Sequence, residues 1–116
     1  MEQISMIEQR DLLLVPFPFS DQSGKKARPV IVISNNEFNK YSEDIIVIGV
    51  TSNISKDKYT VNLSNNNLDE GSLSISCYIK VENILKLDRE LIIKKIGKIN
   101  KNTLKEITSK LLEIIS

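Results

Sequence analysis

Short apolar stretches separated by polar turns make up most of the chain. The segments Leu12–Val15 and Val30–Ile33 are continuous apolar runs of strand length, typical of strands that are buried on both faces. A proline ends the first run and limits that strand to about Asp11–Pro16. Pro29 holds Arg28 in an extended conformation at the start of the second run. The pattern therefore predicts two buried strands, the second of which opens on an arginine.

Four further strands follow from apolar runs or from alternation of apolar and polar residues, and they are expected at Asp44–Val50, Lys58–Leu63, Leu73–Leu87 and Ile92–Ile99. Within the first of these, Gly49 marks a bulge or a close approach of another backbone. Polar clusters predict turns at Asn35–Glu37, Asn65–Asn67, Asp69–Gly71 and Asp88–Glu90.

One helix is predicted at the end of the chain, over about Lys101–Ile115, from apolar residues at helical spacing. Thr103 and Glu106 have the spacing of a capping box at its start. Six or seven short strands with one terminal amphipathic helix predict a mainly β fold, a small barrel with the helix packed on it. The length of 116 residues fits one domain, with residues 1–9 as a lead-in.

Composition excludes several kinds of chemistry. The chain has no histidine and one cysteine, so imidazole catalysis and a disulfide within the chain are impossible, and a metal has almost no candidate ligands. We therefore expect no metal and no cofactor. Cys77 falls on the apolar side of its alternating strand, which favours a buried residue over a nucleophile. The apolar runs are too short to span a membrane, and we expect a soluble, cytoplasmic protein.

Positive charge gathers where the loop Ser20–Ala27 meets the second strand, although the net charge is only +1. Lys25, Lys26 and Arg28 there are suited to binding a phosphate, the guanidinium in a bidentate manner. The neutral triplet Thr51–Asn53 at the end of the third strand adds hydrogen-bonding groups. By composition alone, a solvated loop is the commoner interpretation of such a cluster.

Two other features also have a structural and a functional interpretation. Lys80 and Glu82 alternate in phase, so an ammonium and a carboxylate can share one surface, where a simple ion pair is the commoner outcome. Phe17 and Phe19 either plug the core beneath the loop or line a binding surface, and we favour the core.

Three segments in this order closely resemble the PemK/MazF family of toxin endoribonucleases: DLLLVPFPFSD from Asp11, GKKARPVIVISN from Gly24, and IGVTSN from Ile48. In the second half, YIKVENI from Tyr78 and IGKI from Ile96 are similar to the family's later strands. The resemblance implies an SH3-like barrel related to that of the gyrase poisons. It also implies a homodimer, neutralised by a cognate antitoxin protein, that cleaves single-stranded RNA, usually mRNA, without a metal.

The resemblance also implies roles for individual residues. The family's arginine and threonine correspond to Arg28, which would stabilise charge on the phosphorus, and Thr51, which would orient the phosphate or the attacking 2′-hydroxyl. In another branch the acid and base stand at positions that hold Lys80 and Glu82 here, and which pair transfers protons stays open. The expected RNA contacts are Ser20, Lys25, Lys26, Ser52, Asn53 and Asn83.

The chain departs from the family pattern at two quoted positions. Arg10 replaces a glycine, a difference we interpret as structural, and Asn83 replaces a glutamine. The alternative functions are a gyrase-poison-like inhibitor that does not cut RNA and an inactive binding module, both on the same barrel. The arginine at the start of the second strand favours the nuclease, because a gyrase poison needs no phosphate-binding group there.

Overall fold

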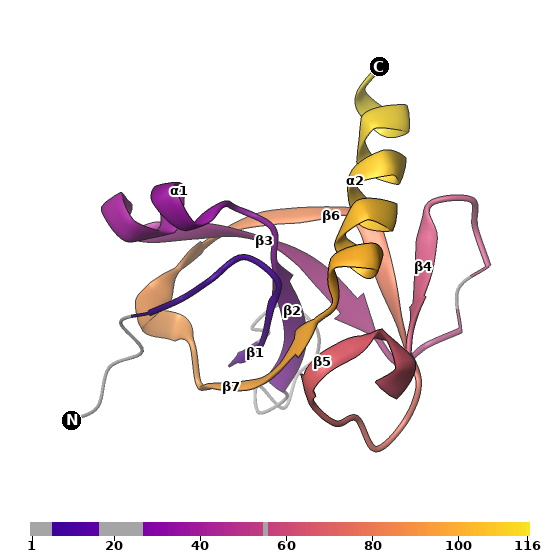
Figure 1. The fold of residues 1–116 in the computed structure, drawn as a ribbon, viewed down its shortest axis with the longest axis horizontal. Coiled ribbons are helices and arrows are strands. Elements are labelled where there is room, and N and C mark those ends of the chain that lie inside the picture. Colours follow the sequence, from indigo (N-terminus) through magenta and orange to yellow (C-terminus); the bar gives the residue numbers. More distant parts are fainter. Residues whose placement is uncertain (1–5, 17–26, 55) are drawn as a thin grey trace.

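The computed structural model describes residues 6–16, 27–54 and 56–116, which form an antiparallel sheet of seven strands in the order β4-β6-β3-β2-β1-β7-β5 (Figure 1). The strands are β1 (Asp11–Pro16), β2 (Ala27–Val32), β3 (Asp44–Thr51), β4 (Thr60–Leu63), β5 (Leu68–Gly71), β6 (Cys77–Asp88) and β7 (Lys94–Ile99). The α-helices are α1 (Asn36–Tyr41) and α2 (Lys101–Ile115), and 3-10 turns occupy Asn65–Asn67 and Arg89–Leu91. The sheet is curled into a half-barrel, which confirms the predicted mainly β fold with a terminal helix.

A break in the pairing of β3 with β6 accompanies this curl. Ile48 pairs with Ile84 and Val50 pairs with Ile79, so Gly49 alone faces the four residues Lys80–Asn83. A Cβ added to Gly49 would lie 3.1 Å from Nδ2 of Asn83, so an amide side chain covers the glycine. The bulge predicted at Gly49 is therefore confirmed. Such bulges bend the longer strand and increase its twist.

The break also changes which side of β6 is buried. Ile79, before the break, and Val81, within it, belong to an apolar cluster with Leu12, Ile31, Ile48, Val50, Val61, Leu63, Cys77, Ile99 and Ile107. After the break, Leu87 belongs to a second cluster with Ile7, Leu13, Val15, Val30, Val32, Ile45 and Val47. Both interiors are aliphatic, and the two faces of the curled sheet each contain one of them.

The helix α2 covers the first cluster and has the predicted bounds. Its apolar stripe, formed by Leu104, Ile107, Leu111 and Ile114, packs on the sheet. The predicted capping box is wrong, because the side chain of Asn100 accepts the hydrogen bonds of Thr103, at 2.9 Å from N and 2.7 Å from Oγ1. Asn100 directly follows β7 and so takes the capping position first. No helix in residues 6–16, 27–54 and 56–116 is long and apolar enough to cross a membrane.

The predicted turn at Asn35–Glu37 is instead the start of α1. Oδ1 of Asn35 accepts from the backbone N of Phe38 at 2.8 Å and caps the helix. Asn39 is buried, and its Nδ2 donates to the carbonyl oxygen of Ser34 at 2.9 Å. Asparagines that favour turns therefore build a short capped helix here, because their amides find backbone partners.

Several strand boundaries also differ from the prediction: β4 begins at Thr60 and not Lys58, and β7 begins at Lys94 and not Ile92. The expected turn at Asp69–Gly71 is part of β5, which pairs with β7 where Gly71 faces Gly97. A Cβ on Gly97 would lie 2.7 Å from the carbonyl oxygen of Glu70, so the two strands approach more closely than side chains allow. The alternating segment Leu73–Ser76 is not part of β6, which begins at Cys77.

Arg10 stands immediately before β1 with φ +83°, in the left-handed region that favours glycine. Its backbone N donates to the carbonyl oxygen of Val32 at 2.8 Å, and its own carbonyl oxygen accepts from N of Ile99 at 2.9 Å. Its Nη1 donates to the carbonyl oxygen of Ile99 at 2.7 Å and to Asp69 at 3.0 Å. These bonds tie β1 to both neighbouring strands and offset the strained conformation. They explain in structural terms how an arginine can stand where the family pattern has a glycine.

We predict that Arg10→Ala keeps the strained backbone, loses the guanidinium bonds, and lowers the free energy of unfolding by about 1–3 kcal/mol. Arg10→Gly loses the same bonds but removes the strain, so it should be about 1 kcal/mol more stable than the alanine variant. Urea denaturation of both variants beside the parent protein measures the order. An alanine variant as stable as the glycine variant would contradict strain at this position.

Candidate active site

The pairing of neighbouring strands sets polar residues in one row across the sheet. Thr51 pairs with Tyr78, and Tyr78 pairs with Asn62 of β4. The pairs of β2 with β3 end at Val30 and Gly49, so Arg28 and Thr51 each lie two residues beyond the last pair. The predicted arginine and threonine are therefore at the same end of two neighbouring strands.

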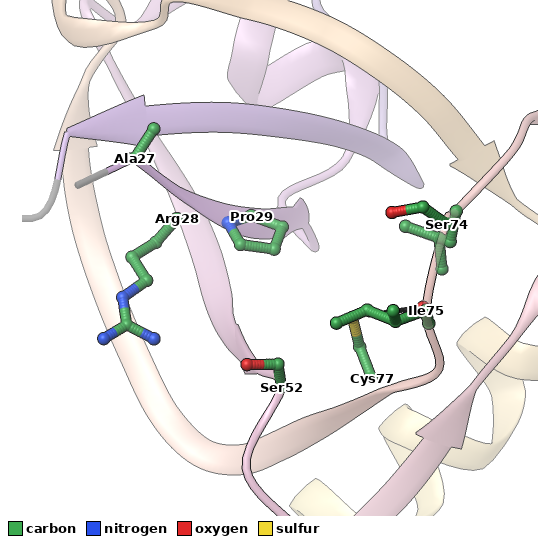
Figure 2. Close-up of a pocket in the computed structure, with 8 residues that line it drawn as sticks. Ala27, Arg28, Pro29, Ser52, Ser74, Ile75 and Cys77 are labelled. Atoms are coloured by element: carbon green, nitrogen blue, oxygen red, sulfur yellow. Dashed lines mark hydrogen bonds between the residues drawn. The ribbon is translucent and has the colours of Figure 1, made fainter.

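Arg28 lines an open pocket of about 260 Å³ between the start of β2, the end of β3 and the segment before β6. Figure 2 shows Arg28 and Ser52 on one side of this pocket and Ser74, Ile75 and Cys77 on the other. The guanidinium and the hydroxyl groups are suited to bind an anion. The apolar wall opposite them is suited to contact an apolar, planar group that is covalently attached to that anion.

The hydroxyl of Thr51 is fixed by the turn that follows β3. Its Oγ1 accepts a hydrogen bond from the backbone N of Asn53 at 3.1 Å. Accepting this bond orients the hydroxyl and leaves its own hydrogen able to donate. Thr51 is thus a hydrogen-bond donor whose position is fixed by a backbone contact at the end of β3.

Lys80 lies between two carboxylates. Its Nζ is 2.6 Å from Oδ2 of Asp57 and 3.3 Å from Oε2 of Glu82. The bond to Asp57, aided by Glu82, raises the pKa of Lys80. The same bond, with one from the Thr60 hydroxyl, lowers the pKa of Asp57 from 3.8 to about 2. Lys80 and Glu82 share one surface as predicted, and Lys80 is a protonated cation at neutral pH, unsuited to act as a base.

Glu82 lines a second pocket of about 310 Å³, with Asp57, Tyr59 and Ile114 of α2. This pocket shares no lining residue with the pocket at Arg28. The structure thus brings Arg28 and Ser52 into one pocket and sets Glu82 in another, beside the terminal helix.

The other predicted RNA contacts differ in position. Asn53 is exposed in the turn after β3, and Asn83 covers Gly49 on the bulge of β6. Ser20, Lys25 and Lys26 lie outside the described residues, as do Phe17 and Phe19. The part of the chain that the structure describes holds no cluster of three or more His, Cys, Asp or Glu side chains that could bind a metal.

Sequence reasoning missed Tyr78, Ser74 and Ile75. Tyr78 lies on the polar side of its strand, but only the register with β3 places it next to Thr51. The sequence pattern predicts Ser74 and Ile75 in a strand, whereas they form the far wall of the pocket at Arg28, and Ile75 is 60% exposed.

Cys77 is buried at the edge of the same pocket, which confirms the prediction of a buried residue. Burial raises the pKa of its thiol.

Fold and site together define a class of small half-barrels with a C-terminal helix and a pocket beside an arginine at the start of the second strand. Residues 8–115 match the family described as PemK-like, MazF-like toxins of type II toxin-antitoxin systems, so the chain belongs to that family. The predicted membership is thereby confirmed.

Individual relatives agree with this assignment. The chain is 32% identical over 100 residues to the Endoribonuclease MazF of Staphylococcus saprophyticus, an alignment that covers 83% of this chain and 78% of the relative. A MazE-MazF structure from Deinococcus radiodurans superposes with a TM-score of 0.76 at 20% identity, over 95% of this chain and 96% of that one. An endoribonuclease from a mycobacterial species gives 0.75 at 15% identity, over 95% and 91%. The two structural matches show a common fold.

We predict that the pKa of Asp57 rises toward its ordinary 3.8 in Lys80→Met, because the bond to Lys80 is the main cause of the lowered value. Since the folded-state pKa is depressed, the ion pair stabilises the folded protein above pH 3.8 and is lost as the pH falls through about 2. Carboxyl NMR titration measures the midpoint. Lys58→Met, at an exposed lysine 4.0 Å from Glu113, is the control, and an equal rise there would contradict a specific Lys80–Asp57 bond.

Proposed function

We propose that this protein is an endoribonuclease toxin that cleaves single-stranded RNA, with mRNA as its cellular target, and needs no metal. The observation that carries the proposal is the open pocket lined by Arg28 and Ser52, which directly follows Thr51 at the end of β3. Membership of the PemK/MazF toxin family and the endoribonuclease name of the 32% identical relative support the same reaction.

The proposed reaction uses the RNA's own nucleophile. The 2′-hydroxyl gives its proton to water as its oxygen attacks the adjacent phosphorus, the bond from phosphorus to the 5′-oxygen breaks, and the products are a 2′,3′-cyclic phosphate and a 5′-hydroxyl. Arg28 neutralises the charge that develops on the phosphorane oxygens and donates a proton to the leaving 5′-oxygen, and the guanidinium then regains a proton from water. Thr51 holds the phosphate in line with the attacking hydroxyl through its donated hydrogen bond. Single-stranded RNA is required because duplex geometry restricts access to this arrangement.

Arg28 and Thr51 are our choice for the chemistry over Lys80 and Glu82. Lys80 is a protonated cation held by Asp57 at 2.6 Å, which suits it to contact a phosphate rather than to accept a proton. Glu82 lines the pocket beside α2 and not the one at Arg28. Ser52, Asn53 and Asn83 remain proposed RNA contacts, with Ser20, Lys25 and Lys26 guiding the RNA backbone.

The proposed partners follow from the reaction and the family. An mRNA-cleaving toxin must act where mRNA is present, so we place it in the cytoplasm. Relatives have been solved as complexes with a cognate antitoxin or as MazE-MazF pairs. We propose that a cognate antitoxin neutralises this chain by covering the polar row.

Replacing Arg28 tests the mechanism. We expect Arg28→Ala to lower the cleavage rate on a long single-stranded RNA by about a hundredfold or more, because a preorganised donor to the developing charge is lost. Arg28→Lys keeps the charge but loses the fork-shaped contact, and should still be at least about tenfold slower. Gel analysis of cleavage with and without EDTA measures both effects, with exposed Lys101→Glu as the control for folding and general charge.

Each contrary result has a distinct meaning. Equal cleavage by Arg28→Ala, or loss of parental cleavage in EDTA, would overturn the mechanism. A loss in Glu82→Gln as large as that in Arg28→Ala would assign proton transfer to Lys80 and Glu82. If the parent protein cuts no RNA, the gyrase-poison-like alternative is tested by a supercoiling assay.

Tyr78 provides an independent test of RNA binding along the row. An aromatic ring beside Thr51 can stack on a base, and such stacking contributes about 1–3 kcal/mol. We expect Tyr78→Leu to weaken binding of a fully 2′-O-methylated RNA, which cannot be cleaved, by about tenfold. Tyr78→Phe keeps the ring and should bind within about twofold of the parent, as measured by fluorescence anisotropy. Equal binding by the leucine variant would exclude a base from this position.

A further inference from the structure

The segment between β3 and β4 is fixed to the sheet at both of its ends. Thr51, the last residue of β3, pairs with Tyr78, and Thr60, the first residue of β4, pairs with Lys80. Tyr78 and Lys80 belong to the same strand, β6, which lies between β3 and β4 in the sheet. The segment therefore leaves the sheet on one side of β6 and returns to it on the other side, two residues along.

Asp57 fixes the last part of this segment to the sheet. Its Oδ1 accepts from the backbone N of Tyr59 at 3.0 Å and from Oγ1 of Thr60 at 2.9 Å. Its Oδ2 accepts from Nζ of Lys80 at 2.6 Å. An aspartate that accepts from the backbone two residues on closes a local turn. Residues 56–59 thus form a turn before β4 that is held against β6, and we call it the β4 turn.

The terminal helix holds the β4 turn from another direction, as α2 lies beside β4 (Figure 1). Nζ of Lys110 donates to the carbonyl oxygen of Lys58 at 3.0 Å. A hydrogen bond from a charged donor is stronger than one between neutral groups. Lys58 also stands 4.0 Å from Glu113, but both side chains are largely exposed, and such an ion pair contributes little. Lys110 therefore makes the stronger of these two contacts between the helix and the turn.

The first residues of the same segment stand at the proposed active site. Ser52 lines the pocket at Arg28, and the backbone N of Asn53 donates to Oγ1 of Thr51 at 3.1 Å. Because the segment is short and both of its ends are fixed, a shift of the β4 turn has to be taken up by the residues that precede it. The contacts of the β4 turn therefore bear on where Ser52 and Asn53 stand.

We propose that Lys110 is a positioning residue for RNA recognition, which acts by holding the β4 turn and, through it, Ser52 and Asn53. The inference rests on the proposed function, because it assigns a part in RNA binding to a helix residue outside the pocket at Arg28. Arg28 and Thr51 lie on strands whose register the apolar clusters fix. Loss of the Lys110 bond should therefore weaken RNA binding more than it slows the cleavage step.

Replacing Lys110 tests this role in steady-state cleavage of a short single-stranded RNA. Lys110→Met keeps the apolar stem and removes the donor, so we expect KM to rise by about threefold to tenfold while kcat stays within about twofold. Lys110→Arg keeps a charged donor and should return KM to within about twofold of the parent. Lys105→Met is the control, because it removes the same charge from an exposed position of the same helix.

Amide chemical shifts, measured by NMR without RNA, separate this inference from the proposed function. The amides of Ser52 and Asn53 should shift in Lys110→Met and stay unchanged in Lys105→Met. Unchanged amides in Lys110→Met, an equal KM rise in both variants, or a fall in kcat without a change in KM would overturn the positioning role. Shifted amides in a protein that cuts no RNA would overturn the proposed function while supporting the coupling between α2 and the segment.

Discussion

The break in pairing between β3 and β6, where Gly49 alone faces Lys80–Asn83, is the constraint on which the rest of the structure depends. It lets one long strand belong to two apolar clusters, because the side of β6 that is buried changes across it. It also separates the half of β6 that pairs with β4 from the half that, among the described residues, pairs with β3 alone. A side chain in place of Gly49 would crowd the amide of Asn83, which lies 3.1 Å from where the added Cβ would be.

The site depends on strand register more than on loop chemistry. Arg28 and Thr51 belong to different strands, and the buried residues that follow Arg28 and precede Thr51 fix where each strand lies. A slip of one residue would turn either side chain to the opposite face. The apolar cores therefore provide the precision that a phosphate contact requires.

Much of the fold could be predicted from the sequence, because apolar periodicity and proline positions are local properties. The bounds of β1 and α2 follow from them directly. The errors arose where tertiary partners override local preference: Asn35 caps a helix, and the segment at Asp69 pairs as a strand with β7. At the site, the resemblance supplied Arg28 and Thr51, whereas the place of Tyr78 beside Thr51 depends on a register that no local pattern contains.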